Sequence, residues 1–394
     1  MIYKLSDIFD LQMGKTPTRS DLSYWQNGSY DWISISDLNT DRKYISDTKE
    51  RITTKAVRES GIKKIPANTV IMSFKLSIGK TAITSHDMFS NEAIMAFIDR
   101  KVIRINPDYI YYLLHALDWN KRANKAVKGR TVNKKIISQT QVNIPDYQTQ
   151  LRIVKIMDST RKRVKIQKDI LSKLDTLIKA RFVEMFGDPL RNDKTWPISK
   201  LKLLTTKVGS GATPKGGKQS YKKEGITLVR SMNVHDGEFV YKDLAYIDTA
   251  QAHDLDNVEL QPKDVFINIT GASVARSCVI PDNILPGRVN QHVAIIRCKE
   301  NLLNYIFLNR LFLNSSFKQK LLAMGQAGGA TRQALTQEQL KKLNLILPPI
   351  ELQNEFASFV QQVDKSKVVN ASIMKYIISI RFYLYFKENK EGAR

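Results

Sequence analysis

The sequence has little cysteine, little histidine and no long apolar run. Its 394 residues include two cysteines, Cys278 and Cys298, and five histidines. Neither residue type falls at metal-ligand spacing, and both cysteines lie in apolar segments, so we expect two reduced, buried thiols in a cytoplasmic protein. No apolar run reaches the ~18 residues that a membrane helix needs. The first ten residues lack the pattern of a secretory signal peptide, so no membrane role is expected.

Negative charge is also in short supply. The formal net charge is +24 at pH 7. The excess is eight charges in residues 1–146 and eight again in residues 186–349. Because the charge is not gathered in a tail, it predicts two basic globular blocks that can bind a polyanion such as nucleic acid. A uniformly basic protein without such a partner is the alternative that charge alone leaves open.

Catalytic motifs are missing as well. The segment Gly79–Thr81 resembles the end of a phosphate-binding loop, but the required glycine five residues earlier is Phe74. A dinucleotide fingerprint that begins at Gly209 would need a glycine where Pro214 stands. "NIPDY" (143–147) only faintly resembles the base-holding loop of amino-methyltransferases. We therefore predict a binding protein with no catalytic residue, no metal and no cofactor of its own.

The two halves of the chain repeat the same series of segments in the same order. The matching pairs are GKTP (14–17) with GATP (211–214), IPANTVIMSF (65–74) with LQPKDVFINI (260–269), SNEAIMAFI (90–98) with VNQHVAIIR (289–297), YIYYLLHAL (109–117) with NYIFLNRLF (304–312), and GRTVNKKIISQTQ (129–141) with GATRQALTQEQ (329–339). Each pair is weak alone, but their shared order indicates an internal duplication.

Residue types predict a mixed α+β domain in each half. Short segments rich in β-branched residues and bounded by turn formers are expected as strands: VIMSF (70–74), DVFINIT (264–270), SCVIP (277–281) and HVAIIRC (292–298). Helical spacing is expected over residues 109–121 and 304–322. The predicted domains cover residues 1–145 and 187–347, a common domain size.

A long helical segment follows each domain. Residues 147–186 contain neither glycine nor proline, and an apolar row recurs every seven residues at Met157, Val164, Leu171, Ile178 and Met185. Residues 348–394 repeat this design with Phe356, Val363, Asn370, Ile377 and Leu384, where the polar Asn370 can fix the register of two helices. Such rows favour a pair of helices over two helices that each pack only on their own domain.

Both helices begin with the same short motif. In "IPDYQTQLRI" (144–153) and "LPPIELQNEF" (347–356), Pro145 aligns with Pro348 and Gln150 with Gln353. Proline suits the first helical turn, and Asp146 is a good N-cap. The two glutamines are expected to bond to the neighbouring helix or domain, with simple solvent exposure as the alternative.

These segments resemble the specificity (S) subunit of type I restriction–modification systems. ARFVEMFGDPLRNDKTWP (180–197) resembles the family's central conserved region, and the motif that begins the second long helix resembles its Pro-Pro…Gln pattern; Asp146 stands where the family often has a second proline. VNQHVAII and GATPKG resemble motifs of its target-recognition domains. The resemblance implies two homologous recognition domains, each followed by a conserved long helix (146–186 and 348–394). It also implies that these helices pair as an antiparallel coiled coil with pseudo-two-fold symmetry.

The resemblance also implies a function. Each domain would read one half of a split, asymmetric target in double-stranded DNA, and helix length would set the distance between the halves. Two adenine methyltransferase (M) subunits would dock on the chain, and a restriction/translocase (R) subunit would join for cleavage. S-adenosylmethionine and ATP would belong to those partners. The alternatives are a nucleic-acid-modifying enzyme with an unrecognised site, and a non-specific DNA-binding scaffold with decayed recognition domains.

Candidate DNA contacts are polar and basic residues in matching loops, because such side chains bind phosphates and base edges. They are Lys15, Thr16, Thr18, Arg19, Lys75, Lys80, Lys128 and Arg130 in the first half, and Thr213, Lys215, Lys218, Arg230, Asn233, Thr270, Arg276 and Arg332 in the second. A solvated surface role is an equal alternative for each of them. Asn91, Asn290 and Gln291 flank strands; structural hydrogen bonding is favoured for them over DNA contact, which stays the alternative. Candidate residues for helix pairing and subunit docking are Gln150, Met157, Val164, Leu171, Ile178, Gln353, Phe356, Val363, Asn370, Ile377 and Leu384.

Overall fold

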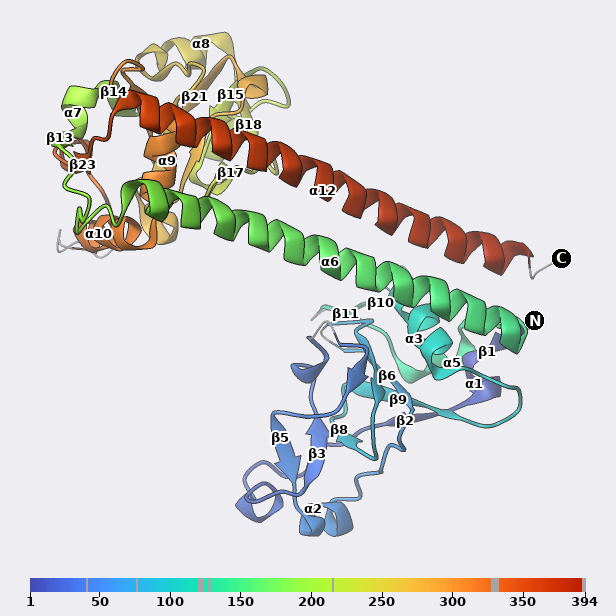
Figure 1. The fold of residues 1–394 in the computed structure, drawn as a ribbon. Coiled ribbons are helices and arrows are strands. Elements are labelled where there is room, and N and C mark those ends of the chain that lie inside the picture. The colour runs from blue at the N-terminus through green and yellow to red at the C-terminus, as the bar shows by residue number, and fades with distance from the viewer. Residues whose placement is uncertain are drawn as a thin grey trace. The chain divides into compact units, whose positions relative to one another are not determined.

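The computed structural model describes residues 1–39, 42–75, 77–119, 124–126, 129–214, 216–326 and 333–391. It divides into two compact units, Met1–Gln167 with Ser372–Arg394, and Lys168–Ala371 (Figure 1). Each unit holds one α+β domain and part of each of two long helices.

Three main sheets build the domain of the first unit. A five-stranded sheet has the order β2 (Phe9–Met13), β9 (Ile94–Asp99), β6 (Val70–Ser73), β7 (Thr81–Thr84) and β4 (Tyr44–Ile45). A three-stranded sheet has the order β5 (Glu50–Ile52), β3 (Tyr30–Ile33) and β8 (Phe89–Ser90), and β1 (Ile2–Lys4) pairs with β12 (Gln141–Asn143). The small hairpin β10 (Asn124–Ala126)–β11 (Gly129–Thr131) and helices α1 (Leu5–Ile8), α2 (Thr54–Glu59), α3 (Pro107–Ala116) and α5 (Lys134–Gln139) complete it.

The domain of the second unit has corresponding sheets. Its four-stranded sheet has the order β14 (Thr205–Ser210), β22 (Val293–Cys298), β19 (Val265–Asn268) and β20 (Ser277–Val279). Beside it are β18 (Ala245–Ile247)–β15 (Ile226–Val229)–β21 (Gly287–Val289), β13 (Ile198–Lys200)–β23 (Asn344–Ile346) and β16 (Val234–His235)–β17 (Glu238–Phe239). The helices are α7 (Leu201–Leu204), α8 (Thr249–His253), α9 (Tyr305–Leu313), α10 (Ser315–Gln326) and α11 (Gln337–Lys341).

The matching strand orders confirm the internal duplication. β2-β9-β6-β7 corresponds to β14-β22-β19-β20, and the parallel pair β3–β8 corresponds to the parallel pair β15–β21. The four predicted strands are present. The single helix predicted over 304–322 is wrong, because Asn314 ends α9 and its Oδ1 accepts from the Ser316 N–H (3.1 Å), which starts α10. The helix predicted over 109–121 ends at Ala116.

The long helices α6 (Tyr147–Phe186) and α12 (Ile350–Glu391) are continuous (Figure 1). Asp146 caps α6, since its Oδ1 accepts from the Thr149 N–H at 2.9 Å. Gly187, with φ +75°, adopts the left-handed conformation that ends α6. Pro348 and Pro349 lie just before α12 rather than in its first turn, which corrects the predicted position.

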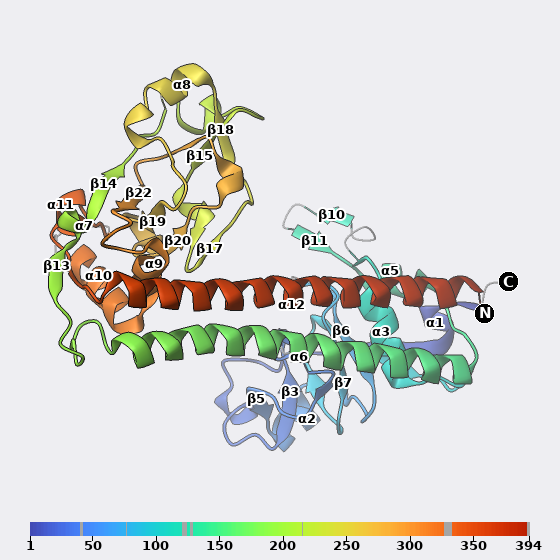
Figure 2. The same cartoon turned by 45° about the horizontal axis from the view of Figure 1, so that its top comes forward.

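In the second unit, the end of α6 packs against the start of α12. Phe186 lies on Phe356 and Phe307, with ring centroids 5.3 and 4.8 Å apart. Ion pairs join Arg181 to Glu355 (3.0 Å) and Asp175 to Lys367 (2.7 Å). Residue numbers therefore rise along α6 as they fall along α12, so the two segments run antiparallel here (Figure 2).

The residues of the two heptad rows do not all have the same surroundings. Met157 is buried in the core of the first domain, and Ile178, Phe356 and Val363 are buried in the core of the second unit. Val164, Leu171 and Ile377 are half-buried, and the Leu384 side chain lies outside the described residues. Asn370 is half-buried and donates to the Ser366 carbonyl of its own helix at 2.8 Å, so its register role stays a prediction.

The two thiols differ in exposure. Cys278 is buried, whereas Cys298 is only partly buried, which corrects the expectation of two buried thiols. Burial raises the pKa of each thiol to about 12. Throughout the described ranges, no helix has the length and apolar character to cross a bilayer. The same residues contain no cluster of three or more His, Cys, Asp or Glu side chains that could hold a metal ion.

Candidate nucleic-acid interface

Gln150 and Gln353 join each long helix to its own domain by the same three hydrogen bonds. The Gln150 Oε1 accepts from the Asn106 N–H (2.9 Å), and its Nε2 donates to the carbonyls of Arg104 (3.1 Å) and Pro145 (3.0 Å). Both glutamines are almost fully buried, at 1% and 0% exposed.

The Gln353 bonds are the counterparts in the second unit. Its Oε1 accepts from the Asn304 N–H (2.9 Å), and its Nε2 donates to the carbonyls of Leu302 (3.2 Å) and Pro348 (2.8 Å). Of the two expected partners, helix or domain, both glutamines bond to their own domain, and their role in helix pairing or subunit docking stays a prediction. Each glutamine side chain hydrogen-bonds to backbone groups at the point where a domain helix begins beside the long helix. It therefore holds its own domain in place on that long helix.

Three loops of the first domain converge at one end of the five-stranded sheet. The Lys15 N–H donates to the Ser90 carbonyl (2.8 Å), and the Phe74 N–H donates to the Ala93 carbonyl (2.9 Å). These bonds bring together the loops that begin at Gly14, Phe74 and Ser90. The candidates Lys15, Thr16 and Lys75 therefore lie in one loop cluster, which we call the first loop cluster (residues 14–19, 74–75, 77–80 and 90–93).

Glu92 lies inside the first loop cluster. Its carboxylate accepts a hydrogen bond from the Thr16 hydroxyl. This hydrogen bond, together with the charges of Lys75 and Arg19, holds the pKa of Glu92 below its usual value although burial opposes the shift. The carboxylate is therefore ionised at neutral pH and can only accept hydrogen bonds.

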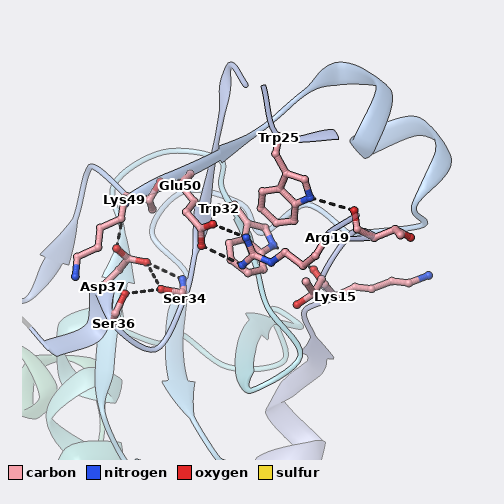
Figure 3. A network of polar contacts seen from close by, with 12 residues as sticks. Lys15, Arg19, Trp25, Trp32, Ser34, Ser36, Asp37, Lys49 and Glu50 are labelled. Atoms are coloured by element: carbon pink, nitrogen blue, oxygen red, sulfur yellow. Dashed lines mark hydrogen bonds and ion pairs between the residues drawn. The ribbon is translucent and has the colours of Figure 1, made fainter. Parts of the chain in front are cut away.

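Arg19 is held between aromatic rings and a carboxylate (Figure 3). Its guanidinium lies 3.9 Å from the ring centroid of Trp25 and 4.8 Å from that of Trp32. Both its terminal nitrogens donate to the carboxylate of Glu50. The Trp25 Nε1 donates to the Thr18 carbonyl at 3.2 Å, which holds this loop to the ring. The Arg19 side chain stays half-exposed, so the pairing orients it rather than hiding it.

The other candidates of the first domain are placed less fully. Lys80 is half-buried beside β7, and its N–H donates to the Ser73 hydroxyl at 3.2 Å. Arg130 belongs to strand β11, but its side chain lies outside the described residues, as does the whole of Lys128.

The second domain has an equivalent loop cluster, which we call the second loop cluster (residues 211–214, 269–276 and 289–292). A chain of hydrogen bonds runs through it. The Thr213 hydroxyl donates to the Gln291 Oε1, the Gln291 Nε2 is 3.2 Å from the His292 Nε2, and the His292 Nδ1 is 2.6 Å from the Thr270 hydroxyl. All three contacts are satisfied when His292 is neutral and carries its proton on Nδ1. Thr213 and Thr270 are thus brought together.

Arg230 repeats the aromatic contact of Arg19 from a different loop. Tyr221 follows the 3₁₀ turn Gly217–Ser220, as Trp25 follows the turn Leu22–Tyr24. The Arg230 guanidinium lies 5.4 Å from the Tyr221 ring centroid and donates to the Asp243 carbonyl. Arg19 and Arg230 therefore both lie against an aromatic ring, but Arg19 comes before β3 and Arg230 comes after β15.

Asn233 is not available as a DNA contact, which corrects its assignment. Its side chain is 0% exposed. The Oδ1 accepts from the Arg230 N–H (3.1 Å), and the Nδ2 donates to the Val240 (2.8 Å) and Lys242 (3.2 Å) carbonyls. Asp37 makes the corresponding bond to the Ser34 N–H in the first domain (2.7 Å), so this position is structural in both.

The remaining candidates lie at the edge of the second loop cluster or outside the described residues. Arg276 is half-buried at the end of the β19–β20 loop. Lys215 and Arg332 lie outside the described residues, and so does the side chain of Lys218. Whether any candidate touches DNA stays a prediction.

Sequence reasoning missed the central position of each loop cluster. The sequence does not single out Glu92, and for Gln291 it favours a structural role over DNA contact. The alignment of "SNEA" with "VNQH" carries the signal, because both residues follow an asparagine at the same point of the repeat.

Two duplicated α+β domains, each presenting a loop cluster of polar and basic side chains and each fastened to a long helix, define a DNA-reading protein of bipartite design. The chain belongs to the type I restriction modification DNA specificity domain family, which matches residues 1–176 and 193–375. DNA target recognition is the function of this family.

Individual relatives agree with this assignment. The chain is 23% identical to the MjaIX type I restriction enzyme specificity subunit of Methanocaldococcus jannaschii, over 96% of this chain and 90% of that one. It is 29% identical to an Escherichia coli type I restriction enzyme specificity subunit, over 37% of each chain. Its fold is similar to that of the S subunit from M. genitalium, with TM-score 0.53, 11% identity and coverage of 99% and 95%. A chain from a type I R-M system described for complex assembly and conformational transition gives TM-score 0.58, 15% identity and coverage of 100% and 96%.

Proposed function

We propose that this chain reads an asymmetric, bipartite DNA target and delivers methyltransferase and restriction subunits to it. The observation that carries the proposal is the pair of loop clusters, which share one hydrogen-bonded frame but present different side chains. A protein with two different reading surfaces suits two different half-sites, in contrast to the palindromes bound by dimers of identical subunits.

The proposal assigns no chemistry to this chain. S-adenosylmethionine would bind the methyltransferase subunits and ATP the restriction subunits. The chain's own residues would bind phosphates, read base edges and hold the two domains on the long helices. This division agrees with a family of specificity subunits that is non-catalytic in general.

Partner docking is proposed on the long helices. In the second unit, exposed apolar side chains lie on α6 (Leu177, Val183) and on α12 (Val368, 67% exposed, and Val369, 58% exposed). Apolar side chains that a chain leaves exposed on helices favour association with another protein surface. We expect Val368→Asp with Val369→Asp to weaken capture of the methyltransferase subunit, while Lys365→Asp on the same helix should weaken it less.

The test compares the purified chain alone with its complex with the methyltransferase subunit of a type I system. Transfer of labelled methyl groups from S-adenosylmethionine to DNA is measured. The expected result is no transfer by the chain alone and transfer by the complex. Methyl transfer by the chain alone would contradict the proposal. Equal modification of all DNA sequences by the complex would favour the decayed scaffold, whose binding is lost at high salt.

A further inference from the structure

Glu92 and Gln291 occupy the same position in the two loop clusters. Each follows an asparagine whose Oδ1 accepts from the N–H two residues ahead: Asn91 from Ala93 (3.1 Å) and Asn290 from His292 (3.0 Å). Each asparagine N–H donates to the end of the equivalent strand, at 3.0 Å to the Ile33 carbonyl of β3 and 3.0 Å to the Val229 carbonyl of β15. The backbone that presents the next side chain is therefore the same in both domains.

A threonine steadies each of these two side chains from the same neighbouring loop. Thr16 in GKTP donates to the Glu92 carboxylate, and Thr213 in GATP donates to the Gln291 Oε1. Both Glu92 and Gln291 are exposed beyond this contact. The Gln291 Nε2 is also 3.2 Å from the His292 Nε2, so this amide keeps its second N–H and the second lone pair of its Oε1 for a ligand. A side chain that is held in place while keeping unused donors or acceptors is preorganised to bind a ligand edge, because less rotamer freedom is lost on binding.

The two side chains differ in hydrogen-bonding chemistry. An ionised glutamate only accepts, whereas a glutamine amide both accepts and donates. In the major groove, the cytosine N4 amino group offers a donor to a carboxylate, and adenine offers a donor and an acceptor that match an amide. A carboxylate among Lys15, Lys75 and Arg19 also opposes the phosphate attraction of those cations, so its presence weakens non-sequence-specific binding.

We propose that Glu92 and Gln291 are equivalent specificity-determining residues, and that Glu92 selects a cytosine in one half-site while Gln291 selects an adenine in the other. This inference rests on the proposed reading of a bipartite target. It goes further by naming the position of the repeat that determines which base is preferred. It also gives a reason why the two half-sites differ at that base.

The test uses the complete complex with methyltransferase subunits and a randomised DNA library. The methylated sequences are determined for the wild-type chain, for Glu92→Gln and for Gln291→Glu. Glu92→Gln should change the preferred base from cytosine to adenine at one base pair of one half-site, with a change in preference of about tenfold to a hundredfold. Gln291→Glu should make the reverse change in the other half-site. The spacer and all other positions should stay the same.

Asp10→Asn is the matched control, since it removes one negative charge at the other end of β2. It should leave the target unchanged. Glutamine can still accept from Thr16, so the frame is expected to survive, and thermal unfolding of each variant checks this. If one variant does not fold, the other tests the proposal in its own domain.

Two further outcomes are separable. An unchanged target in folded Glu92→Gln and Gln291→Glu complexes would overturn the inference and leave the threonine contacts as purely structural. If the wild-type complex shows no bipartite target at all, the proposed function fails first, before either variant is considered.

Discussion

The two recognition domains share a set of hydrogen bonds in their loop clusters and differ in the exposed side chain that these bonds position. The threonine contact, the asparagine turn and the buried glutamine occur at equivalent positions in both domains. The exposed side chain after the asparagine is a glutamate in one domain and a glutamine in the other. The two domains therefore keep the same hydrogen-bonded frame at this position and differ in the side chain that it presents.

The ends of α6 differ in how they meet their domains. In the first unit, Asp158 accepts from Lys43 (2.7 Å) and from the Tyr112 hydroxyl, and Arg161 donates to the Tyr111 hydroxyl (2.8 Å). In the second unit, Phe182 and Phe186 pack on other phenylalanines. Both ends of α6 bury apolar side chains in their domains, but the first-unit end adds polar and ionic contacts whereas the second-unit end adds contacts between aromatic rings.

The largest expected effect comes from changing the length between the two attachments. One heptad inserted between Val164 and Leu171, with a matching heptad after Asn370 in α12, adds about 10 Å of helix. We expect the target spacer to lengthen by about three base pairs, at 3.4 Å per base pair, with both half-sites unchanged. Sequencing of DNA methylated by the complex measures this. Altered half-sites would argue against the helices as spacers.

Removing an aromatic contact of α6 in the second unit should reduce stability more than removing a polar contact of α6 in the first unit. Phe356→Ala should destabilise the second unit by about 3–5 kcal/mol, because it empties a fully buried ring site. Asp158→Asn should lower the stability of the first unit by about 1 kcal/mol or less, since Asp158 is 43% exposed and solvent screens its ion pair with Lys43. Lys43 would still have its second ion pair, to Asp108 at 2.8 Å. Hydrogen exchange of α9 and α3 reports the two units separately, and equal costs would contradict this contrast.

The shared anchors should cost the same in both units. Gln150→Ala and Gln353→Ala each leave one N–H and two carbonyls without their partner, which we expect to destabilise the local unit by about 2–3 kcal/mol. The exposed neighbours Gln148→Ala and Gln361→Ala serve as controls and should change stability by less than about 0.5 kcal/mol. Urea unfolding followed by hydrogen exchange measures each change. A loss confined to one unit would break the equivalence.

The stacked arginines should act on separate half-sites. Arg19→Ala should weaken binding to duplexes that carry one half-site, and Arg230→Ala to duplexes that carry the other, by about 1–3 kcal/mol each if these side chains reach base edges. Glu50→Gln should instead strengthen binding to unrelated DNA at low salt, because it releases the Arg19 charge. Fluorescence anisotropy at two salt concentrations measures all three. Equal loss on both half-sites would show that the arginines do not read DNA separately.

Much of the fold could be predicted from the sequence, because its signals are local. The β-branched segments formed the expected strands, Asp146 capped α6, and Gly187 ended it. The failures came where one residue type can serve two purposes. Asn314 sits inside an apolar helical pattern but accepts from a backbone N–H and breaks the helix. Asn233 has an amide that could bind a base edge, yet that amide hydrogen-bonds to backbone groups of its own loop.

The candidate site was harder to predict, because it depends on contacts between loops. Lys15, Thr16 and Lys75 were selected one at a time, and only the fold brings them beside Glu92. The glutamines of the helix-start motif bond to the domain, one of the two partners that the sequence left open. For each glutamine, two of the three bonds run to an N–H and a carbonyl 44 to 51 positions earlier in the chain, which no local pattern specifies.

The most direct test of the central claim is the sequence of the DNA that the complex modifies. A complex of this chain with methyltransferase subunits is supplied with a randomised library, and methylated adenines are mapped by sequencing. We expect two different half-sites separated by a spacer of fixed length and indifferent sequence. A palindromic target, or a single uninterrupted site, would contradict the claim that the two domains read DNA independently.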